Sequence, residues 1–474
     1  MKQFKYITIL LFGFLVSVSC DSDFEEINTD PNNPTSVPSS LLIPSIVRNA
    51  QNQSYSTFAG GDMGACWSQH FAKVQYNDEA RYIPRQGVIS SIWDTYYANV
   101  ISDAAAMHTI AISEENNNMQ AVALIFQAYG FAFLTDVYGD IPFTEAIKAE
   151  AGIIAPAYDS QEVVYQGILA MLDNAIALLG TGGDIDEIND ILYEGNVSLW
   201  KKFAASLKFR VLMRASGQLD VSSQLQELVN SGDLFSSNDE DAKLIYLSAQ
   251  PSANPLYETI VYGTRGEWKI NSVLVDQLTF DNDPRLPVYA QMNSDGDYRG
   301  KPSGFTDVPN DDYNYDNVSP LGEFYLQPEL PGFFVSFSEL SFLMAEAAVK
   351  GYISGDANAL YRQGIKASFD FNGIPSADTD KFLISKVLSS NQAQALEQIG
   401  TQNWVGLYTQ GIESWTEWRR TGFPSLSPAA ESVSAIPSRY NYPTEESSIN
   451  AANYNAAVAA QGPDLLTTPI WWMK

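Results

Sequence analysis

Apolar residues recur at intervals of three and four positions over most of the chain, which is the spacing of helices with one buried face. Between residues 121 and 137, for example, such a stripe runs through Ala121, Leu124, Ile125 and Ala128. Strict alternation of apolar and polar residues, the pattern of a half-buried strand, is scarce. The sequence therefore predicts a mainly α-helical protein. The expected helices cover residues 92–108, 121–137, 163–179, 197–215, 337–350, 357–369, 392–418 and 447–460.

Two consecutive windows near residue 350 contain the small residues that let paired helices pack closely. The first runs from Ser341 to Gly351, and the second, from Gly355 to Ile365, follows after a short turn. This spacing resembles a tetratricopeptide helix–turn–helix unit, whose repeat is about 34 residues long. Because the repeats along the chain are degenerate, we expect tetratricopeptide-like helical pairs to form a scaffold that carries insertions, rather than a uniform solenoid.

The segment of about 246–333 has a different composition from the helical windows. Residues 251–330 contain 8 Pro, 6 Gly, 9 Asp and 11 aromatic residues, which argues against long helices and for loops that turn often. The aromatic residues give the segment enough apolar surface to fold. Since long loops on a rigid scaffold often carry binding residues, we expect this segment to face the ligand.

The first twenty residues have the pattern of a secretory leader. Lys2 and Lys5 precede an apolar run over residues 7–16, and small residues then lead to Cys20. A cysteine in that place resembles a bacterial lipobox, which implies cleavage before Cys20 and attachment of lipid to its thiol. An ordinary signal peptide with an incidental cysteine is the alternative. The predicted organisation is a lipoprotein signal peptide (1–19), a lipidated cysteine with an extended tether (20–40) and a single helical unit (41–474).

The predicted tether also bears on the location of the protein. Asp, Asn, Ser and Pro are frequent between residues 20 and 40, as expected of an extended, solvated linker. Acidic residues directly after a lipid-bearing cysteine resemble the export signal of lipoproteins that face the cell exterior on the outer membrane. No later stretch approaches the roughly 20 apolar residues of a membrane helix. The lipid on Cys20 is therefore the expected attachment to the membrane.

The charge balance excludes several classes of partner. Acidic residues outnumber basic ones by 56 to 27, which gives a net charge of −29 at pH 7. Such a surface repels phosphate backbones and releases few counterions, so no nucleic-acid partner is expected. The same balance disfavours polyanionic glycans as ligands, although a local basic pocket would override it. The chain has two histidines, His70 and His108, which excludes a histidine-rich metal cage.

The sequence contains no motif that predicts catalysis. There is no G-x-S-x-G elbow, no H-E-x-x-H motif and no complete phosphate-binding loop. A pair of carboxylates could serve a glycoside hydrolase, but among 56 acidic residues some pair falls close together by chance. We therefore predict a protein that is not an enzyme. A lipid-anchored α-helical glycoside hydrolase is the alternative from a different class.

Two acidic loop segments offer oxygen ligands. Asp281 and Asp283 flank an asparagine, and residues 293–297 carry an asparagine and two aspartates. Such oxygens could hold Ca²⁺, but the full twelve-residue loop with its terminal glutamate is missing. Solvated turns are the favoured interpretation, and no cofactor or metal is predicted.

Aromatic and planar polar residues gather in two loop segments and are the candidate binding residues. Aromatic rings stack on the C–H faces of sugars or on peptide side chains, while arginines fix the orientation of a ligand. Each ring could equally belong to the core. The candidates are Tyr76, Arg81 and Tyr82 in one loop and Trp268, Tyr298, Arg299, Tyr313 and Tyr315 in the loop-rich segment.

Other aromatic and charged residues are expected to have structural roles. The tryptophans on helical faces should lie in the core, and those near the C-terminus should pack the chain end onto the body. Arg439 should be buried and paired with a carboxylate in a cluster that includes Tyr442 and Glu446, because a buried arginine needs one. The tryptophans expected in the core are Trp67, Trp93, Trp200, Trp404 and Trp415, and the terminal ones are Trp471 and Trp472.

Six features in order along the chain resemble the SusD/RagB family of surface nutrient-binding lipoproteins. None of them is decisive alone, but their ordered combination is specific, and the similarity runs from Cys20 to the C-terminus. The features are the lipobox, Asn28–Pro34, Leu134–Phe143, the helix around Leu343–Ala347, Glu417–Gly422, and Arg439–Pro443 with Glu446 and Asn450.

This resemblance implies a fold, a partner and a role. The implied fold has four tetratricopeptide-like units and an irregular part that faces the ligand. The implied partner is a SusC-like TonB-dependent transporter of the outer membrane, over whose barrel the protein would form a hinged lid. The ligand expected from the family is an oligosaccharide, and an oligopeptide is the alternative within the same family.

Overall fold

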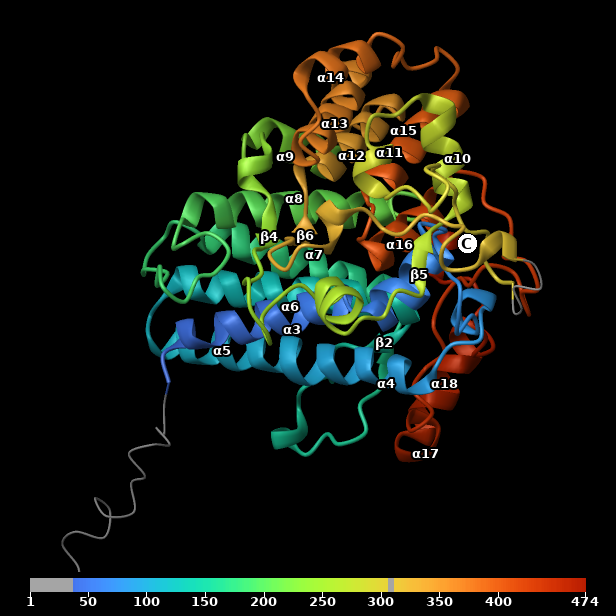
Figure 1. Ribbon diagram of the computed structural model, residues 1–474. Helices are drawn as coiled ribbons and strands as arrows, with labels where there is room; N and C mark the ends of the chain where they lie inside the picture. Colours follow the sequence, from blue (N-terminus) through green and yellow to red (C-terminus); the bar gives the residue numbers. More distant parts are fainter. Residues whose placement is uncertain (1–36, 306–310) are drawn as a thin grey trace, which may run out of the picture.

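The computed structural model describes residues 37–305 and 311–474 (Figure 1). Cys20 and most of the expected tether lie outside the described residues, so the leader and the lipidation site stay predictions. The described chain starts with a short 3-10 helix, η1 (Ser39–Leu42), whose first backbone N–H donates to the Glu114 carboxylate (3.0 Å). This contact holds η1 at the C-terminal end of the helix that spans Ser102–Ser113.

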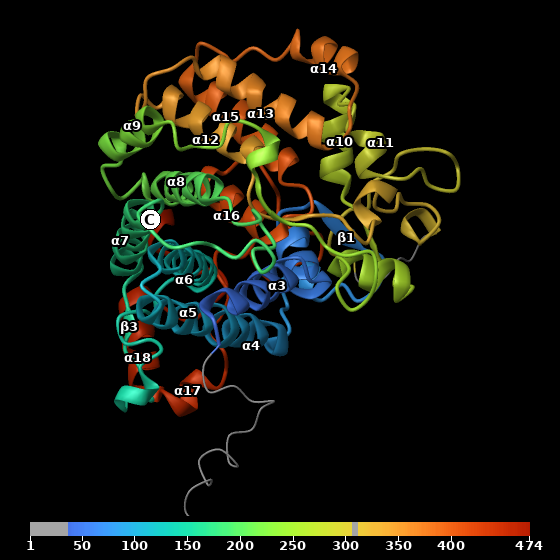
Figure 2. The same cartoon turned by 90° about the vertical axis from the view of Figure 1, so that its left-hand side faces the viewer.

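Most of the described chain is helical, as the spacing of apolar residues predicts. Consecutive helices pack as antiparallel neighbours in a stack from α5 to α8, and a second group built on α12, α13 and α15 continues it (Figure 2). The first group comprises α3 (Ile43–Ser54), α4 (Gln86–Asp94), the π-helix η4 (Thr95–Ile101), α5 (Ser102–Ser113), α6 (Asn117–Tyr138), α7 (Gln161–Leu178), α8 (Val197–Ala215) and α9 (Ser222–Ser231). The second comprises α12 (Phe337–Val349), α13 (Ala357–Phe371), α14 (Ser376–Leu383), α15 (Gln392–Gly406) and α16 (Gly411–Thr421). The last two α-helices, α17 (Glu446–Ile449) and α18 (Ala451–Gln461), lie at the opposite end of the molecule (Figure 1).

Local capping explains where several helices begin. The side chain of Asn116 accepts a hydrogen bond from a backbone N–H in the first turn of α6, and Ser336 and Asp356 do the same for α12 and α13. At α7 the capping side chain is Ser160. Asp159 instead accepts hydrogen bonds from two backbone N–H groups of the preceding loop. These caps satisfy orphan N–H groups, so the starts are set by nearby residues.

The prediction of one helix over residues 392–418 is wrong. The chain breaks after α15, and Thr409 adopts a left-handed backbone conformation (φ 69°) before α16 begins at Gly411. A Cβ at Gly411 would lie 2.0 Å from the Gly60 carbonyl oxygen. The π-helix η2 (Thr57–Ala65) therefore packs directly against the start of α16, and this tertiary contact accounts for the break.

Among the described residues the strands form only two-stranded sheets. One of them, β1 (Phe71–Lys73) with β5 (Trp268–Ile270), joins the 70s loop to the loop-rich segment, with Lys73 opposite Trp268. This antiparallel pair brings together two parts of the chain that are almost 200 residues apart. The other pairs are β2 (Ile141–Pro142) with β3 (Tyr158–Asp159) and β4 (Ala242–Leu244) with β6 (Gly332–Val335).

The loop-rich segment gathers at one side of the molecule, next to β1 (Figure 2). It is more ordered than composition suggests, because it contains short helices between its turns. These are the π-helix η7 (Tyr257–Tyr262), α10 (Ser272–Asp281) and α11 (Leu286–Tyr289).

The core contains the helical tryptophans, as predicted. Trp67, Trp200, Trp404 and Trp415 are at most 2% exposed, and Trp93 is also buried. The apolar helix α6 is long enough to span a membrane by length and composition, contrary to the expectation for stretches after the leader, but most of it is buried inside the protein. Its apolar surface therefore serves the core.

The C-terminal segment packs onto the body, as predicted, but Arg439 pairs with a carboxylate outside the expected cluster. Arg439 is fully buried, and its carboxylate partner is Asp464 at 3.1 Å. Glu446 instead accepts a hydrogen bond from the Tyr158 hydroxyl (2.6 Å). Trp472 is buried and donates to Asp136 (3.1 Å), as expected for a residue that holds the chain end.

Candidate functional site

The β1–β5 pair brings three of the sequence-predicted residues together. Tyr76 follows β1, Trp268 begins β5, and the Tyr315 hydroxyl donates to the side chain of Gln75 beside Tyr76 (3.0 Å). The guanidinium of Arg265 lies 5.9 Å from the Tyr76 ring centre and 5.3 Å from that of Trp268. One arginine thus connects rings from both loop segments.

The three rings differ in exposure, and so in what they can contact. Tyr76 is 59% exposed and Tyr315 is 42% exposed, so both side chains are open to solvent. Trp268 is 1% exposed, and its indole N–H donates to the Asp62 carboxylate (2.7 Å). Stacking on a ligand needs a ring face that Trp268 does not expose. We therefore correct its expected role to that of a buried support beneath the exposed rings.

Phe58 and two arginines complete this surface. The guanidinium groups of Arg85 and Arg265 lie 5.1 and 5.7 Å from the centre of the Phe58 ring. Arginine planes over a ring combine a flat apolar face with outward hydrogen-bond donors. We call the surface formed by Phe58, Tyr76, Arg85, Arg265 and Tyr315 the aromatic platform.

Sequence reasoning missed Phe58, Arg85 and Arg265. The platform combines Phe58 from η2, Tyr76 and Arg85 from the chain after β1, and Arg265 and Tyr315 from the chain before and after β5, so no local motif contains it. The one available signal was the run Arg265–Trp268, which places an arginine and a glutamate directly before a tryptophan.

Arg81 and Tyr82 hold a distant loop instead of facing a ligand together. The Tyr82 ring is 2% exposed, and its hydroxyl accepts a hydrogen bond from the backbone N–H of Ala429 (2.8 Å). Arg81 donates to the backbone carbonyl of Glu431 (3.0 Å). The stacking role expected of Tyr82 is therefore corrected, because its ring is part of the core.

The remaining candidates form a second ring group in the loop-rich segment. Tyr313 stacks on Phe305 with ring centres 6.0 Å apart and nearly parallel planes, and the Arg299 guanidinium lies 5.0 Å from the Tyr313 ring centre. The Lys301 ammonium lies near both rings. Tyr298 is partly buried and packs against the core. The structure therefore brings Tyr313 and Arg299 together, whereas Tyr298 packs against the core and is not part of this group.

Asp62 is the buried acceptor below the platform. Besides Trp268 it binds the Lys73 ammonium (3.0 Å), and Arg85 lies 3.5 Å away. Burial raises the pKa of Asp62 from 3.8 to about 6, although the positive charge of Lys73 acts in the opposite direction. Its position on η2 therefore ties the helix that carries Phe58 to both strands of the β1–β5 pair.

The segments considered for Ca²⁺ use their oxygens within the protein. Asp281 pairs with Lys386 (2.8 Å), and Asp283 pairs with Arg285 (2.6 Å). The side-chain oxygen of Asn293 accepts hydrogen bonds from two backbone N–H groups of its own turn. Within residues 37–305 and 311–474, no group of three or more His, Cys, Asp or Glu side chains could hold a metal ion.

Cys66 and His70 are not arranged for nucleophilic catalysis. Cys66 is 1% exposed, and burial raises the pKa of its thiol. Burial likewise lowers the pKa of His70 to about 3, and its ring packs against Trp404. A protonated, buried thiol is a poor nucleophile, so both residues serve packing.

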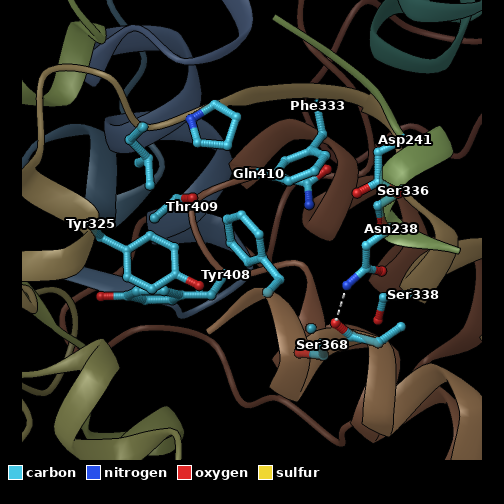
Figure 3. Close-up of a pocket in the computed structure, with 15 residues that line it drawn as sticks. Asn238, Asp241, Tyr325, Phe333, Ser336, Ser338, Ser368, Tyr408, Thr409 and Gln410 are labelled. Carbon is cyan, nitrogen blue, oxygen red and sulfur yellow. Dashed lines mark hydrogen bonds between the residues drawn. The ribbon is translucent and has the colours of Figure 1, made fainter. Parts of the chain in front are cut away.

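An enclosed cavity that shares no residue with the aromatic platform lies beside β6, α13 and the break before α16 (Figure 3). Its volume is about 20 Å³, enough for roughly one water molecule. Asn238 donates a hydrogen bond to the Ala367 carbonyl at its edge (2.9 Å). A sugar ring does not fit this space, so this cavity is not the candidate for a ligand. The cavity's aromatic lining consists of Tyr325, Phe333, Phe371 and Tyr408.

A tetratricopeptide-like scaffold with exposed rings on one loop-rich side is the architecture of a helical protein that binds a ligand on its surface. Residues 31–443 match the model of the SusD-like family, which is described as starch-binding and associating with the outer membrane. The chain belongs to this family. No curated protein sequence matches the chain.

Solved structures share the fold over nearly the whole chain. A chitin-binding protein is 26% identical, with a TM-score of 0.82 over 92% of this chain and 99% of its own. A SusD homologue from Bacteroides fragilis is 25% identical, with a TM-score of 0.80 over 92% and 100%. A chitin-binding SusD homologue from Flavobacterium johnsoniae, at 24% identity and a TM-score of 0.78 over 92% and 97%, shows the common fold.

Proposed function

We propose that this protein is a non-catalytic cell-surface receptor that captures oligosaccharides on the aromatic platform and delivers them to a SusC-like TonB-dependent transporter. The observation that carries the proposal is that two exposed rings lie side by side: Tyr76, with the guanidinium of Arg265 beside it, and Tyr315, whose hydroxyl donates to the neighbouring Gln75. The starch-binding description of the family and the chitin-binding name of a similar structure support a carbohydrate ligand.

The platform has the chemistry that a sugar chain requires. Ring faces of Tyr76, Tyr315 and Phe58 can stack on C–H faces of pyranose rings, while guanidinium N–H groups donate to hydroxyls. Gln75 is exposed and adds an amide beside Tyr76. An open surface accepts the middle of a long chain, which a closed pocket would exclude. The arrangement offers no activated nucleophile or acid–base pair, and this supports capture without cleavage.

The proposed anchor is the lipid on Cys20, with the tether leading to η1. The described fold begins beside the end of α5, where Ser39 binds Glu114. A tether there would hold the folded unit close to the outer membrane and to a membrane-embedded transporter. Two measurements test the anchor and the partner. The transporter should copurify with the native protein, and the Cys20→Ser variant of this protein should be lost from membranes.

Calorimetry with named chains tests the binding proposal. Chitohexaose and maltohexaose are titrated into the native protein and into the double variant Tyr76→Ala/Tyr315→Ala, with a mixed hexapeptide as the test of the peptide alternative. We expect at least one sugar to bind the native protein and to lose most of its affinity for the double variant. Peptide binding alone would replace the sugar proposal. Release of shorter chains from the sugar during incubation would favour the glycoside hydrolase.

A further inference from the structure

Cations are concentrated around the platform, although the chain as a whole is strongly acidic. Four cations lie within about 6 Å of one or more of its ring centres or of the Trp268 ring below: Lys73, Arg85, Arg265 and Lys269. Without compensation, four positive charges at one surface would attract a chain that carries carboxylate or sulfate groups. The sign of the electrostatic potential at the platform therefore depends on the charged groups beneath it.

Each arginine of the platform has a buried carboxylate behind it. Arg85 pairs with Glu79, and Arg265 pairs with Glu267. The arginine side chains are 41% and 37% exposed, whereas the glutamate side chains are only 3% and 4% exposed. The donors thus face solvent while the compensating charges stay inside, where solvent screens them little.

The third cation is compensated in the same way. Lys73 is buried and binds Asp62 at 3.0 Å, and Asp62 also lies 3.5 Å from Arg85. Three of the four cations therefore stand against buried carboxylates. The fourth, Lys269, donates to the backbone carbonyl of Tyr315 (3.0 Å), and Asp316 is the negative charge that acts on it. By Coulomb's law, a carboxylate twice as far from a ligand anion as the arginine in front of it offsets half of the attraction. The net charge of −29 opposes an anion further.

We propose that Asp62, Glu79 and Glu267 neutralise the aromatic platform from below and so make it select uncharged saccharide chains over chains that carry carboxylate or sulfate groups. This inference rests on the proposed function, because it names the class of sugar that the same surface takes. The arginines then act as hydrogen-bond donors and flat stacking surfaces for hydroxyl-bearing rings, without the net charge of an anion site.

The test compares matched chains and matched variants. Chitohexaose and maltohexaose are each titrated as the neutral chain and with their primary hydroxyls oxidised to carboxylates, in 20 and 300 mM NaCl. The variants are Glu267→Gln and Glu79→Gln. The control is Asp370→Asn, which removes one negative charge from an exposed pair with Lys366 and leaves the platform intact.

For the native protein we expect the neutral chain to bind at least tenfold more tightly than its carboxylated form, with little dependence on salt. Glu267→Gln should tighten binding of the carboxylated chain severalfold, in a salt-dependent way, while affinity for the neutral chain changes less than threefold. The unchanged neutral chain also shows that the variant is folded. Asp370→Asn should leave both affinities unchanged.

Three results would overturn the inference. Equal or tighter native binding of the carboxylated chain would contradict it while leaving the receptor proposal intact. If Glu267→Gln and Glu79→Gln each changed the affinity for the neutral chain as much as that for the carboxylated chain, the glutamates would only support the structure. If the native protein bound neither form of either sugar, the proposed function itself would fail, and the inference with it.

Discussion

The helical core and the aromatic platform both pair arginines with carboxylates, but the core buries both members of each pair, whereas the platform buries only the carboxylate. In the core, Arg210 and Glu339 form a bidentate pair between α8 and α12, and both side chains are at most 5% exposed. On the platform the arginine is more than one-third exposed and only the glutamate is buried. The same pairing therefore fixes helices to one another in the core and presents donors to a ligand on the platform.

The core network shows how far this burial goes. Arg214 binds Asp136 (2.5 Å) and Glu417 (3.0 Å) and also contacts Glu413, while Arg420 joins Glu417 to Glu346. Positive charge from Arg420 and Arg214 outweighs the effect of burial and lowers the pKa of Glu417 to about 2. These ion pairs link α6, α8, α12 and α16, so the charges of the network are used within the protein.

The largest expected effect is on the core side of the comparison. Arg214→Met would leave Asp136 and Glu417 as buried carboxylates without their shared cation, which typically costs about 3–5 kcal/mol. Urea denaturation should show this loss in the free energy of unfolding. The matched control is Lys366→Met in the exposed pair with Asp370, which should cost no more than about 1 kcal/mol. Similar losses in both variants would remove the distinction.

The next effect is on ligand affinity at the platform. Tyr76→Ala and Tyr315→Ala should each weaken oligosaccharide binding by about 1–3 kcal/mol, the usual range for a stacked ring, with little change in stability because both rings are exposed. Calorimetry measures the affinity. Phe280→Ala, on an exposed ring of α10, is the control and should bind as the native protein does. Unchanged affinity in both tyrosine variants would refute the platform as the site.

Trp268→Phe sharpens the boundary between the two regions. It keeps an aromatic ring in the β1–β5 pair but removes the donor to Asp62, and we expect a loss of about 1 kcal/mol in stability because Lys73 still binds that carboxylate. Thermal denaturation and calorimetry together separate stability from affinity. A large loss of affinity with unchanged stability would mean that Trp268 contacts the ligand after all.

The smallest expected effect is a pH dependence of selectivity. Burial raises the pKa of Asp62 to about 6, so its negative charge is present above that pH and is lost as the pH falls through it; Lys73, Arg85 and Glu79 are the charged groups that face it. Between pH 7 and pH 5 the platform therefore gains positive charge. A carboxylated oligosaccharide, still ionised at pH 5, should bind a few-fold more tightly relative to its neutral form. Asp62→Asn should abolish this change, and its persistence in that variant would assign it to another group.

Much of the scaffold could be predicted because its signals are local. The helix over Val197–Ala215 agrees with the prediction at both ends, and those at 121–137, 337–350 and 357–369 agree within a few residues. Periodic apolar residues and capping side chains act within one or two turns of the helix they define. The break before α16 could not be predicted, because it follows from the close contact of Gly411 with η2.

The candidate site was predicted only in part. Tyr76 and Tyr315 were identified and are exposed, but Trp268 and Tyr82 were grouped with them and are buried. An aromatic residue in a loop has the same local pattern whether its ring faces solvent or the core, so no window of sequence separates the two cases. The arginines that complete the platform lay outside the chosen residues for the same reason.

By itself the sequence determined that the protein is helical, that the tryptophans on its helical faces form the core, and that its other rings concentrate in two loop segments. These properties depend on residue type and on neighbours along the chain. The tertiary structure alone decided which rings are exposed, and that Glu79 and Glu267, which are close to Arg85 and Arg265 in the sequence, are buried while the arginines are not. Burial depends on contacts between segments as much as 240 residues apart, and those contacts exist only once the β1–β5 pair and the packing of η2 have formed.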